Sequence, residues 1–320
     1  MNLTLITQIV PVETSPGSAL TVPVMLDHCI ERFLVSQDVT AASRETYRRS
    51  LQQFTEWLRT TGRVFNLSVL TREDILIYKK SISEYGRNAY TISSYLTAVR
   101  KLFEWLEAEK IYPNIARGVK GAKKPRGFRK ECLIPEQVRE ALESIDTRTQ
   151  DGLRDYALFN LMVRTGLRTI EIARATVGDI RQQSGEAVLW VQGKGRDAKD
   201  DFVLLLPETL KPINQYLATR KISSDSDPLF ASHSNRTSGA PLATRSIRRI
   251  IKSIFRGIAL DSDRLSAHSL RHTAITLSIR GGASLQQAQA MARHTDPRTT
   301  MVYLHNLDRV QSGAERCIKI

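Results

Sequence analysis

The sequence predicts a mainly helical protein of two domains, with a small antiparallel β-sheet confined to the second. Three observations support this fold class. Apolar residues recur at helical spacing through most of the chain, β-rich runs are clear at one place only, and a basic segment containing Pro and Gly interrupts the pattern. The length of 320 residues fits two domains of about 150 residues each. With 41% apolar residues, the chain can bury a hydrophobic core in both.

The composition excludes several classes of protein. No apolar run reaches the ~18 to 20 residues that a membrane-spanning helix needs. The first residues lack the basic start and the small-residue cleavage site of a secretory signal, so we expect a cytoplasmic protein. The cysteines Cys29, Cys132 and Cys317 are scattered and lack CxxC spacing. They therefore predict neither a disulfide framework nor a zinc site.

The charge of the chain indicates a polyanionic partner. Its 47 Lys and Arg exceed its 33 Asp and Glu, which gives a formal charge of +14 and a pI near 9.9. Between Lys110 and Lys130 basic residues accumulate without any Asp or Glu, among two Pro and three Gly. Such a segment is typical of an interdomain linker that lies along a phosphate backbone, although a solvated linker has the same composition.

The N-terminal half of the pattern predicts a tail followed by a helical domain. Residues 1–20 show no periodicity and are expected to form the tail. In residues 21–110, apolar residues at steps of three and four form stripes, which include Leu26, Ile30, Phe33 and Leu34, then Tyr47, Leu51, Phe54 and Leu58. Thr71 with Asp74, and later Asn88, are expected to begin two more helices. We therefore predict a bundle of about four helices.

Residues 131–320 predict a mostly helical second domain. Two β-rich runs, 186–192 and 201–206, flank the Gly-rich segment GKGRDAKD and indicate a hairpin with a basic tip. Helical patterns lie on both sides of this hairpin. They cover about 135–145, 152–163, 210–220, 243–255, 270–280, 285–291 and 298–304.

Two segments of the second domain carry residues suited to an anionic substrate. In TGLRTIEIA, Arg168 precedes Glu171 by three residues, which by itself is more typical of a surface ion pair at a helix start than of a substrate site. In LSAHSLRHTAIT, Ser266 can cap a helix on which His268 and Arg271 share a face, an arrangement that suits a phosphate. His268 and His272 also have the spacing of a helical zinc pair. Ser269 stands where the HExxH motif needs Glu, which disfavours a zinc hydrolase.

A third segment, ARHTDPRTTMVYLH, places His294 nine residues before Tyr303, across a loop that contains Pro297. A Tyr beside an apolar helix is ordinarily a core residue. This one follows, in order, Arg168, a basic hairpin tip with Lys194, and the HSLRH segment. The order of these groups is more informative than any one of them.

The ordered set TGLRTIEIA, GKG on a hairpin, HSLRH, and ARH followed by Tyr303 resembles the tyrosine recombinase (phage integrase) family of site-specific DNA recombinases, which includes the Xer proteins. The resemblance extends from about Val22 to Tyr303. It implies an N-terminal four-helix SAM-like core-binding domain at 21–110, a basic linker at 111–130 and a catalytic domain at 131–320. The twenty residues before the first helix are fewer than a separate arm-binding domain needs.

The resemblance also implies a catalytic set, carried over residue by residue: Arg168, Lys194, His268, Arg271, His294 and Tyr303. In the family, the tyrosine attacks the scissile phosphodiester and forms a 3′-phosphotyrosine. The two guanidinium groups can stabilise the non-bridging oxygens, because they are always charged and planar. His268 is the candidate base and Lys194 the candidate general acid, with Lys199 as its competitor. His294 would bind the phosphate or help to hold the tyrosine.

The same resemblance implies the partners. We expect double-stranded DNA and a homotetramer on two DNA sites, or a heterotetramer with a related recombinase. We expect no metal, nucleotide or other cofactor, because each step exchanges one phosphoester for another and the sequence has no Walker-type motif. The chain departs from the family at Arg293, where Gly usually precedes the second His. The alternative is a DNA-binding protein of the same fold without catalysis.

Overall fold

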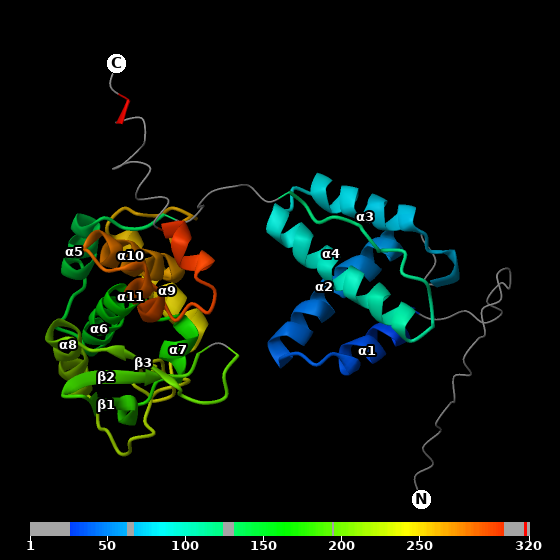
Figure 1. Cartoon of the computed structure of the whole chain (residues 1–320). Helices are drawn as coiled ribbons and strands as arrows, with labels where there is room; N and C mark the ends of the chain where they lie inside the picture. Colours follow the sequence, from blue (N-terminus) through cyan, green and yellow to red (C-terminus); the bar gives the residue numbers. More distant parts are fainter. Residues whose placement is uncertain (1–25, 63–66, 124–130, 194, 304–316, 319–320) are drawn as a thin grey trace, which may run out of the picture. The chain divides into compact units, whose positions relative to one another are not determined.

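The computed structural model of the chain describes residues 26–62, 67–123, 131–193, 195–303 and 317–318. The chain divides into two compact units, Met1–Arg126 and Gly127–Ile320, each described here by itself (Figure 1). The predicted fold class is confirmed: the units are mainly helical, and a small antiparallel sheet lies in the second. The predicted tail 1–20 and Lys194 fall outside these ranges. No helix in the described ranges is both long and apolar enough to span a bilayer.

The first unit contains the expected four helices, α1 (Leu26–Ser36), α2 (Ala41–Thr60), α3 (Arg72–Glu84) and α4 (Ala89–Ala108), and a short 3-10 turn at Leu67–Val69. α2 and α4 pack against each other. The apolar stripes of the sequence meet in one core, because each helix turns its stripe inward. Its fully buried members include Leu26, Phe33, Leu34, Leu51, Phe54, Leu58, Leu96 and Phe103.

Polar side chains fix where these helices begin. The side chain of Asn88 accepts a hydrogen bond from the backbone N–H of Thr91 at 2.9 Å, at the start of α4. At the start of α3, the backbone N–H of Thr71 donates to the carboxylate of Asp74 at 2.8 Å. Both contacts satisfy N–H groups that a helix end leaves unpaired. The two helix starts expected from sequence are therefore present.

The segment predicted as a linker, 111–130, differs in the structure from a free connection. Ala116 and Val119 are buried in the core of the first unit, and the Tyr112 hydroxyl donates to the carbonyl of Leu70 at 2.8 Å. In the sequence, the many basic residues obscure the apolar residues between them. Burial of these apolar residues holds the segment on the helices. Residues 124–130, with half of the basic cluster, lie outside the described ranges.

The second unit contains a three-stranded antiparallel sheet, which lies at one side of the unit with most of the helices beyond it (Figure 1). Its strands are β1 (Ile180–Gln183), β2 (Glu186–Val191) and β3 (Asp201–Leu204), and Leu189 is paired with Val203 across the predicted hairpin. The sequence did not predict β1, because IRQQ is short and polar. The helices are α5 (Pro135–Glu143), α6 (Gln150–Thr165), α7 (Thr169–Arg174), α8 (Pro207–Leu217), α9 (Thr244–Gly257), α10 (Ala267–Arg280) and α11 (Leu285–Ala292), with a further helical stretch at 298–303 and a 3-10 turn at Val177–Asp179.

Helix α10 is the central helix of this unit, because α6, α9 and α11 all pack against it. It is buried on nearly every side, so several polar residues lie in the interior: Ser269, Arg271, His272, Thr273 and Thr276. Buried polar groups are retained in proteins when they have hydrogen-bond partners. The buried polar side chains of α10 therefore face the surrounding elements of the unit, whereas His268, near the start of the helix, is exposed.

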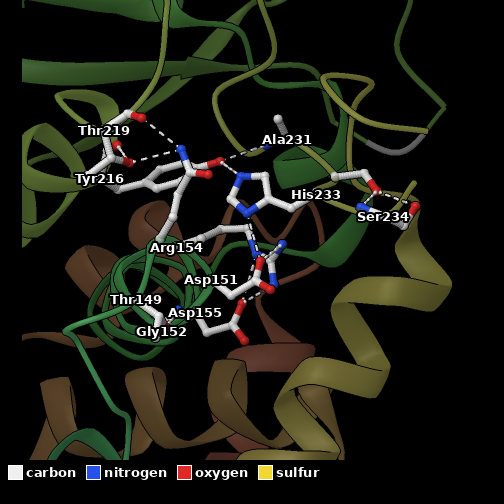
Figure 2. Close-up of polar contacts among 12 residues, drawn as sticks. Thr149, Asp151, Gly152, Arg154, Asp155, Tyr216, Thr219, Ala231, His233 and Ser234 are labelled. Carbon is white, nitrogen blue, oxygen red and sulfur yellow. Dashed lines mark hydrogen bonds and ion pairs between the residues drawn. The ribbon is translucent and has the colours of Figure 1, made fainter. Parts of the chain in front are cut away.

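A separate polar network holds the loop between α8 and α9 onto α6 (Figure 2). His233 bridges the carboxylate of Asp151 on α6, at 2.6 Å, and the hydroxyl of Tyr216 on α8, at 3.1 Å. The same hydroxyl accepts the backbone N–H of Ala231 at 3.2 Å. Arg154 pairs with Asp151 at 2.8 Å. These contacts connect α6 with α8 and the loop that follows α8, so the cluster supports the fold of the unit.

Candidate active site

Three parts of the second unit supply the candidate site. Helix α6 ends at Gly166, whose φ of 65° is the left-handed conformation that Gly adopts without strain, and Arg168 then begins α7. Helix α10 supplies His268 and Arg271, and the segment after α11 supplies His294 and Tyr303. One cavity of about 630 Å³ is lined by Arg168, His268, Arg271, His294 and Tyr303. Five of the six predicted residues are thus brought together, and the sixth, Lys194, lies outside the described residues.

Arg271 is almost completely buried, at 1% exposure. Its guanidinium donates to the carbonyl of Gly166 at 2.7 Å and to the carbonyl of Ala292. These oxygens close α6 and α11, so one side chain joins α10 to two helix ends. Burial, together with the charges of Arg168 and Arg293, lowers the pKa of Arg271 to about 10. The group therefore remains a cation at neutral pH.

Arg168 faces the cavity and is held from behind by Glu171. Its guanidinium and its backbone N–H both donate to the Glu171 carboxylate, at 2.8 and 2.7 Å. Glu171 is fully buried and also pairs with Arg293 at 2.8 Å. The ion pair between Arg168 and Glu171 that the sequence suggested is present, but it lies in the interior of the unit rather than on its surface. It fixes the direction of a guanidinium that borders the cavity.

Tyr303 is buried, at 5% exposure, and its hydroxyl shares a hydrogen bond with Nδ1 of His272. Its ring lies nearly parallel to that of His294, with centroids 6.5 Å apart. Burial raises the pKa of Tyr303 to about 12, against the opposing charges of Arg271 and Arg168. The phenol is therefore neutral at pH 7, and a nucleophilic role requires a base that takes its proton during attack.

The structure places His272, rather than the predicted base His268, next to the Tyr303 hydroxyl. His268 is exposed, one helical turn earlier on α10, and its ring meets that of His272 edge-on at 4.7 Å between centroids. The sequence places His272 four residues after His268, on the same face of the helix. That spacing by itself suggests a zinc pair and does not indicate a contact with Tyr303. Among the described residues, no group of three or more His, Cys, Asp or Glu has an arrangement that could hold a metal ion.

His294 is half-buried between the cavity and the following helical stretch. Its Nδ1 lies 2.8 Å from the Thr300 hydroxyl, and its carbonyl accepts a hydrogen bond from the Gln289 side chain. Burial, followed by the charges of Arg271, Arg168 and Arg293, lowers the pKa of His294 to about 4. The imidazole is therefore neutral at pH 7. Because Thr300 engages Nδ1, Nε2 is left for a ligand in the cavity, and it donates when Nδ1 accepts from the Thr300 hydroxyl.

The family of the chain follows from two sequence models that together cover both units. Residues 131–309, more than half of the chain, match the phage integrase family. This chain belongs to the phage integrase family. Residues 30–110 also match the phage integrase N-terminal SAM-like domain, a range that covers α2, α3, α4 and most of α1. The resemblance predicted from the ordered motifs is confirmed.

Relatives of this phage integrase family member include tyrosine recombinases. XerD of Listeria innocua serovar 6a is 25% identical over 287 residues, 88% of this chain and 93% of the relative. XerD of Haemophilus influenzae is 27% identical over 285 residues, 88% and 93% of the two chains. The fold is similar to that of the XerH recombinase bound to its difH substrate, at 20% identity and a TM-score of 0.70 over 91% of this chain and 84% of that one. Lambda integrase bound to a core site gives 14% identity and a TM-score of 0.68 over 86% and 97%.

Of the two hairpin lysines in this phage integrase family member, Lys199 is the one that lies among the described residues. Lys199 pairs with Asp179, whose side chain is only 3% exposed, and lies 3.4 Å from the Thr176 hydroxyl. The contact ties the end of the β2–β3 connection to the turn before β1. The Lys199 side chain thus forms an ion pair that supports the fold. Lys194 falls outside the described residues.

Proposed function

We propose that this chain is a site-specific DNA recombinase that cuts and rejoins DNA strands through a 3′-phosphotyrosine intermediate. The observation that carries the proposal is the shared cavity, whose lining brings together the side chain of Tyr303, three histidines and several arginines, Arg168 and Arg271 among them. Guanidinium groups suit a phosphoryl-transfer transition state, because its negative charge collects on the non-bridging oxygens. The proposal also draws on relatives that are named tyrosine recombinases.

In the proposed cleavage step, the Tyr303 oxygen attacks phosphorus and the bond from phosphorus to the 5′ oxygen breaks. The phenol proton passes to His272, which shares a hydrogen bond with that hydroxyl. The ring of His268 contacts the ring of His272, so His268 is the next group that can take up the proton. Lys194 gives a proton to the departing 5′ oxygen. In the second step, the 5′-hydroxyl of a partner strand attacks the phosphotyrosine and the proton transfers reverse. One phosphoester replaces another at each step.

In this proposal, Arg168 and Arg271 stabilise the charge on phosphate, and neutral His294 supplies a hydrogen bond to it. The proposed domains are the core-binding domain at 21–110, the basic connection at 111–130 and the catalytic domain at 131–320. Lambda integrase has been solved as a tetramer bound to a Holliday junction. By that likeness we propose double-stranded DNA as substrate, a homotetramer on two sites or a tetramer with a related recombinase, and action in the cytoplasm at the nucleoid.

The test of the proposal is a covalent-adduct assay. Duplexes that bind the full-length protein are selected from a random-sequence pool, and a nick is placed near the centre of the selected site so that the cleaved end diffuses away. We expect a protein–DNA adduct that survives denaturing electrophoresis without added metal or nucleotide. Specific binding without any adduct, for nicks on either strand, would instead establish the non-catalytic alternative.

The exposed face of α9 is a candidate DNA contact, because basic residues follow one side of the helix. Arg245, Arg248 and Arg249 are exposed, whereas Ile247 and Ile251 are buried on the opposite side. The double substitution Arg248→Gln with Arg249→Gln should weaken binding to selected and unrelated duplexes alike. If both contact phosphates, the slope of log K against log salt should fall by about 2.

The matched control removes two surface arginines that already have carboxylate partners. Arg139 pairs with Glu136 and Arg148 pairs with Asp146. Arg139→Gln with Arg148→Gln changes the net charge by the same amount. Fluorescence anisotropy at several salt concentrations measures both doubles. Equal losses in the two proteins would contradict a specific role for α9 and leave only an effect of net charge.

A substrate with a sulfur at the 5′ bridging position separates the two lysines, because a thiolate leaves without a proton. We expect Lys194→Ala to cleave the ordinary nicked duplex slowly and the sulfur-containing duplex at nearly the wild-type rate. Lys199→Ala should instead lower thermal stability, because it leaves the buried Asp179 without its cation. Rescue of Lys199→Ala and not of Lys194→Ala would reverse the assignment.

A further inference from the structure

Arg293 has a backbone conformation that its side chain disfavours. It lies at the end of α11 with φ 54° and ψ 46°, the left-handed region that Gly occupies freely. Its side chain is nevertheless 6% exposed, so the strained residue is also a buried cation. Strained residues persist where the surrounding structure holds them and often mark functional sites. The contacts of Arg293 show what holds it.

The Arg293 guanidinium reaches back to the framework of the site. It donates to the Glu171 carboxylate at 2.8 Å and to the carbonyl of Met291 at 2.8 Å. Its Nε is buried without a hydrogen-bond partner in the part of the chain that the structure describes. Arg293 lines the cavity of about 630 Å³ and a neighbouring cavity of about 390 Å³ on the hairpin side, and Arg168 and His294 also border both.

The charge balance around Glu171 depends on Arg293. With Arg168 alone, Glu171 forms a pair of zero net charge, whereas with both arginines the group carries one positive charge. Burial by itself would raise the pKa of Glu171, but the charges of Arg293 and Arg168 hold it below its usual value. The carboxylate therefore stays ionised. This added positive charge borders the cavity in which a phosphate would bind, and it favours an anion there.

We propose that Arg293 is a positioning residue for phosphate cleavage, because it shares the Glu171 carboxylate with Arg168 and so directs the Arg168 guanidinium and its charge toward the cavity. The inference rests on the proposed function and concerns Arg293, the position at which the chain departs from the family pattern given above. Arg293 acts through Glu171 and Arg168 and needs no contact of its own with DNA. The residue that would remove the strain, Gly, would also remove this charge.

The test measures single-turnover cleavage of the nicked selected duplex at saturating DNA. Arg293→Gly should fold, because Gly takes the left-handed conformation freely. We expect its cleavage rate to fall at least about tenfold while the Kd for DNA changes less than about threefold. Arg293→Lys should retain part of the rate, because lysine keeps the positive charge but lacks the planar guanidinium group. Ala259→Gly, at a residue with φ 58° that does not line the cavity, controls for the release of backbone strain and should cleave normally.

A double-mutant cycle with Glu171→Gln decides whether Arg293 acts through Glu171. If it does, Arg293→Gly should cost far less in the Glu171→Gln background than in the wild type. Equal losses in both backgrounds, or a single variant that cleaves within twofold of wild type, would overturn the inference. An NMR titration of His294 supplies a readout without DNA: its pKa should rise in Arg293→Gly, and an unchanged value would also overturn it. Absence of any wild-type adduct would count against the proposed function alone.

Discussion

Tyr303→Phe should form no covalent adduct with a nicked site that the wild-type protein cleaves. The substitution removes one oxygen, the proposed nucleophile, and retains the ring that packs beside His294. We expect adduct formation to fall by at least about 10³-fold, to the detection limit, because no other atom of the residue can attack phosphorus. Gel quantification after single-turnover incubation measures this loss.

The same variant should bind DNA and remain folded. The Tyr303 hydroxyl shares one hydrogen bond with His272, and the net cost of losing such a bond is about 1 kcal/mol. The melting temperature should therefore move by only a few degrees. Tyr156→Phe removes a hydroxyl from α6, at a residue outside the cavity lining, and should cleave at the wild-type rate. An adduct that persists in Tyr303→Phe would show that another residue is the nucleophile.

Arg271→Ala should abolish cleavage and also destabilise the second unit. The guanidinium satisfies the carbonyls of Gly166 and Ala292 in an interior site. Its removal leaves both acceptors unpaired and opens a cavity, so we expect a loss of about 3 kcal/mol in the free energy of unfolding. Denaturant titration measures this loss. Arg271→Lys keeps the charge but lacks the planar fork that spans two carbonyls, so it should remain largely inactive.

Arg168→Ala is the informative partner of that experiment. Its side chain is 27% exposed, and Glu171 keeps Arg293 as a partner when Arg168 is removed. We therefore expect a comparable loss of cleavage with a smaller loss of stability, about 1 kcal/mol. If both variants lost equal stability, or if Arg271→Ala unfolded at the wild-type midpoint, the structural role assigned to Arg271 would be wrong.

Much of the fold could be predicted from periodicity, because long amphipathic helices carry a repeated signal. The stripe through Leu51, Phe54 and Leu58 is the core of α2, as expected. The apolar pattern did not indicate the structure where a segment is short or where basic residues interrupt its apolar ones. Strand β1 has four residues and a polar sequence, and the apolar residues of 111–123 are hidden among lysines and arginines. Burial of those residues depends on surfaces formed by other helices, which local patterns do not describe.

The identities of the candidate site residues could be predicted from motif order, but their partners could not. Arg271 and Gly166 are 105 residues apart, and the pairing of Glu171 with Arg293 crosses 122 residues. Contacts over such separations depend on how α10 packs between α6 and α11. The same holds for His272, which the spacing placed on the face of His268 without indicating which imidazole would meet Tyr303.

The two carbonyls that Arg271 holds have a consequence for how this lineage can change. A descendant that gave up DNA cleavage but kept DNA binding could lose Tyr303 at small cost, whereas loss of Arg271 would endanger the whole second unit. Homologues that have lost cleavage should therefore retain the equivalent of Arg271 even where the equivalent of Tyr303 has been substituted. For the same reason, its presence in a sequence reports an intact fold more directly than it reports an active enzyme.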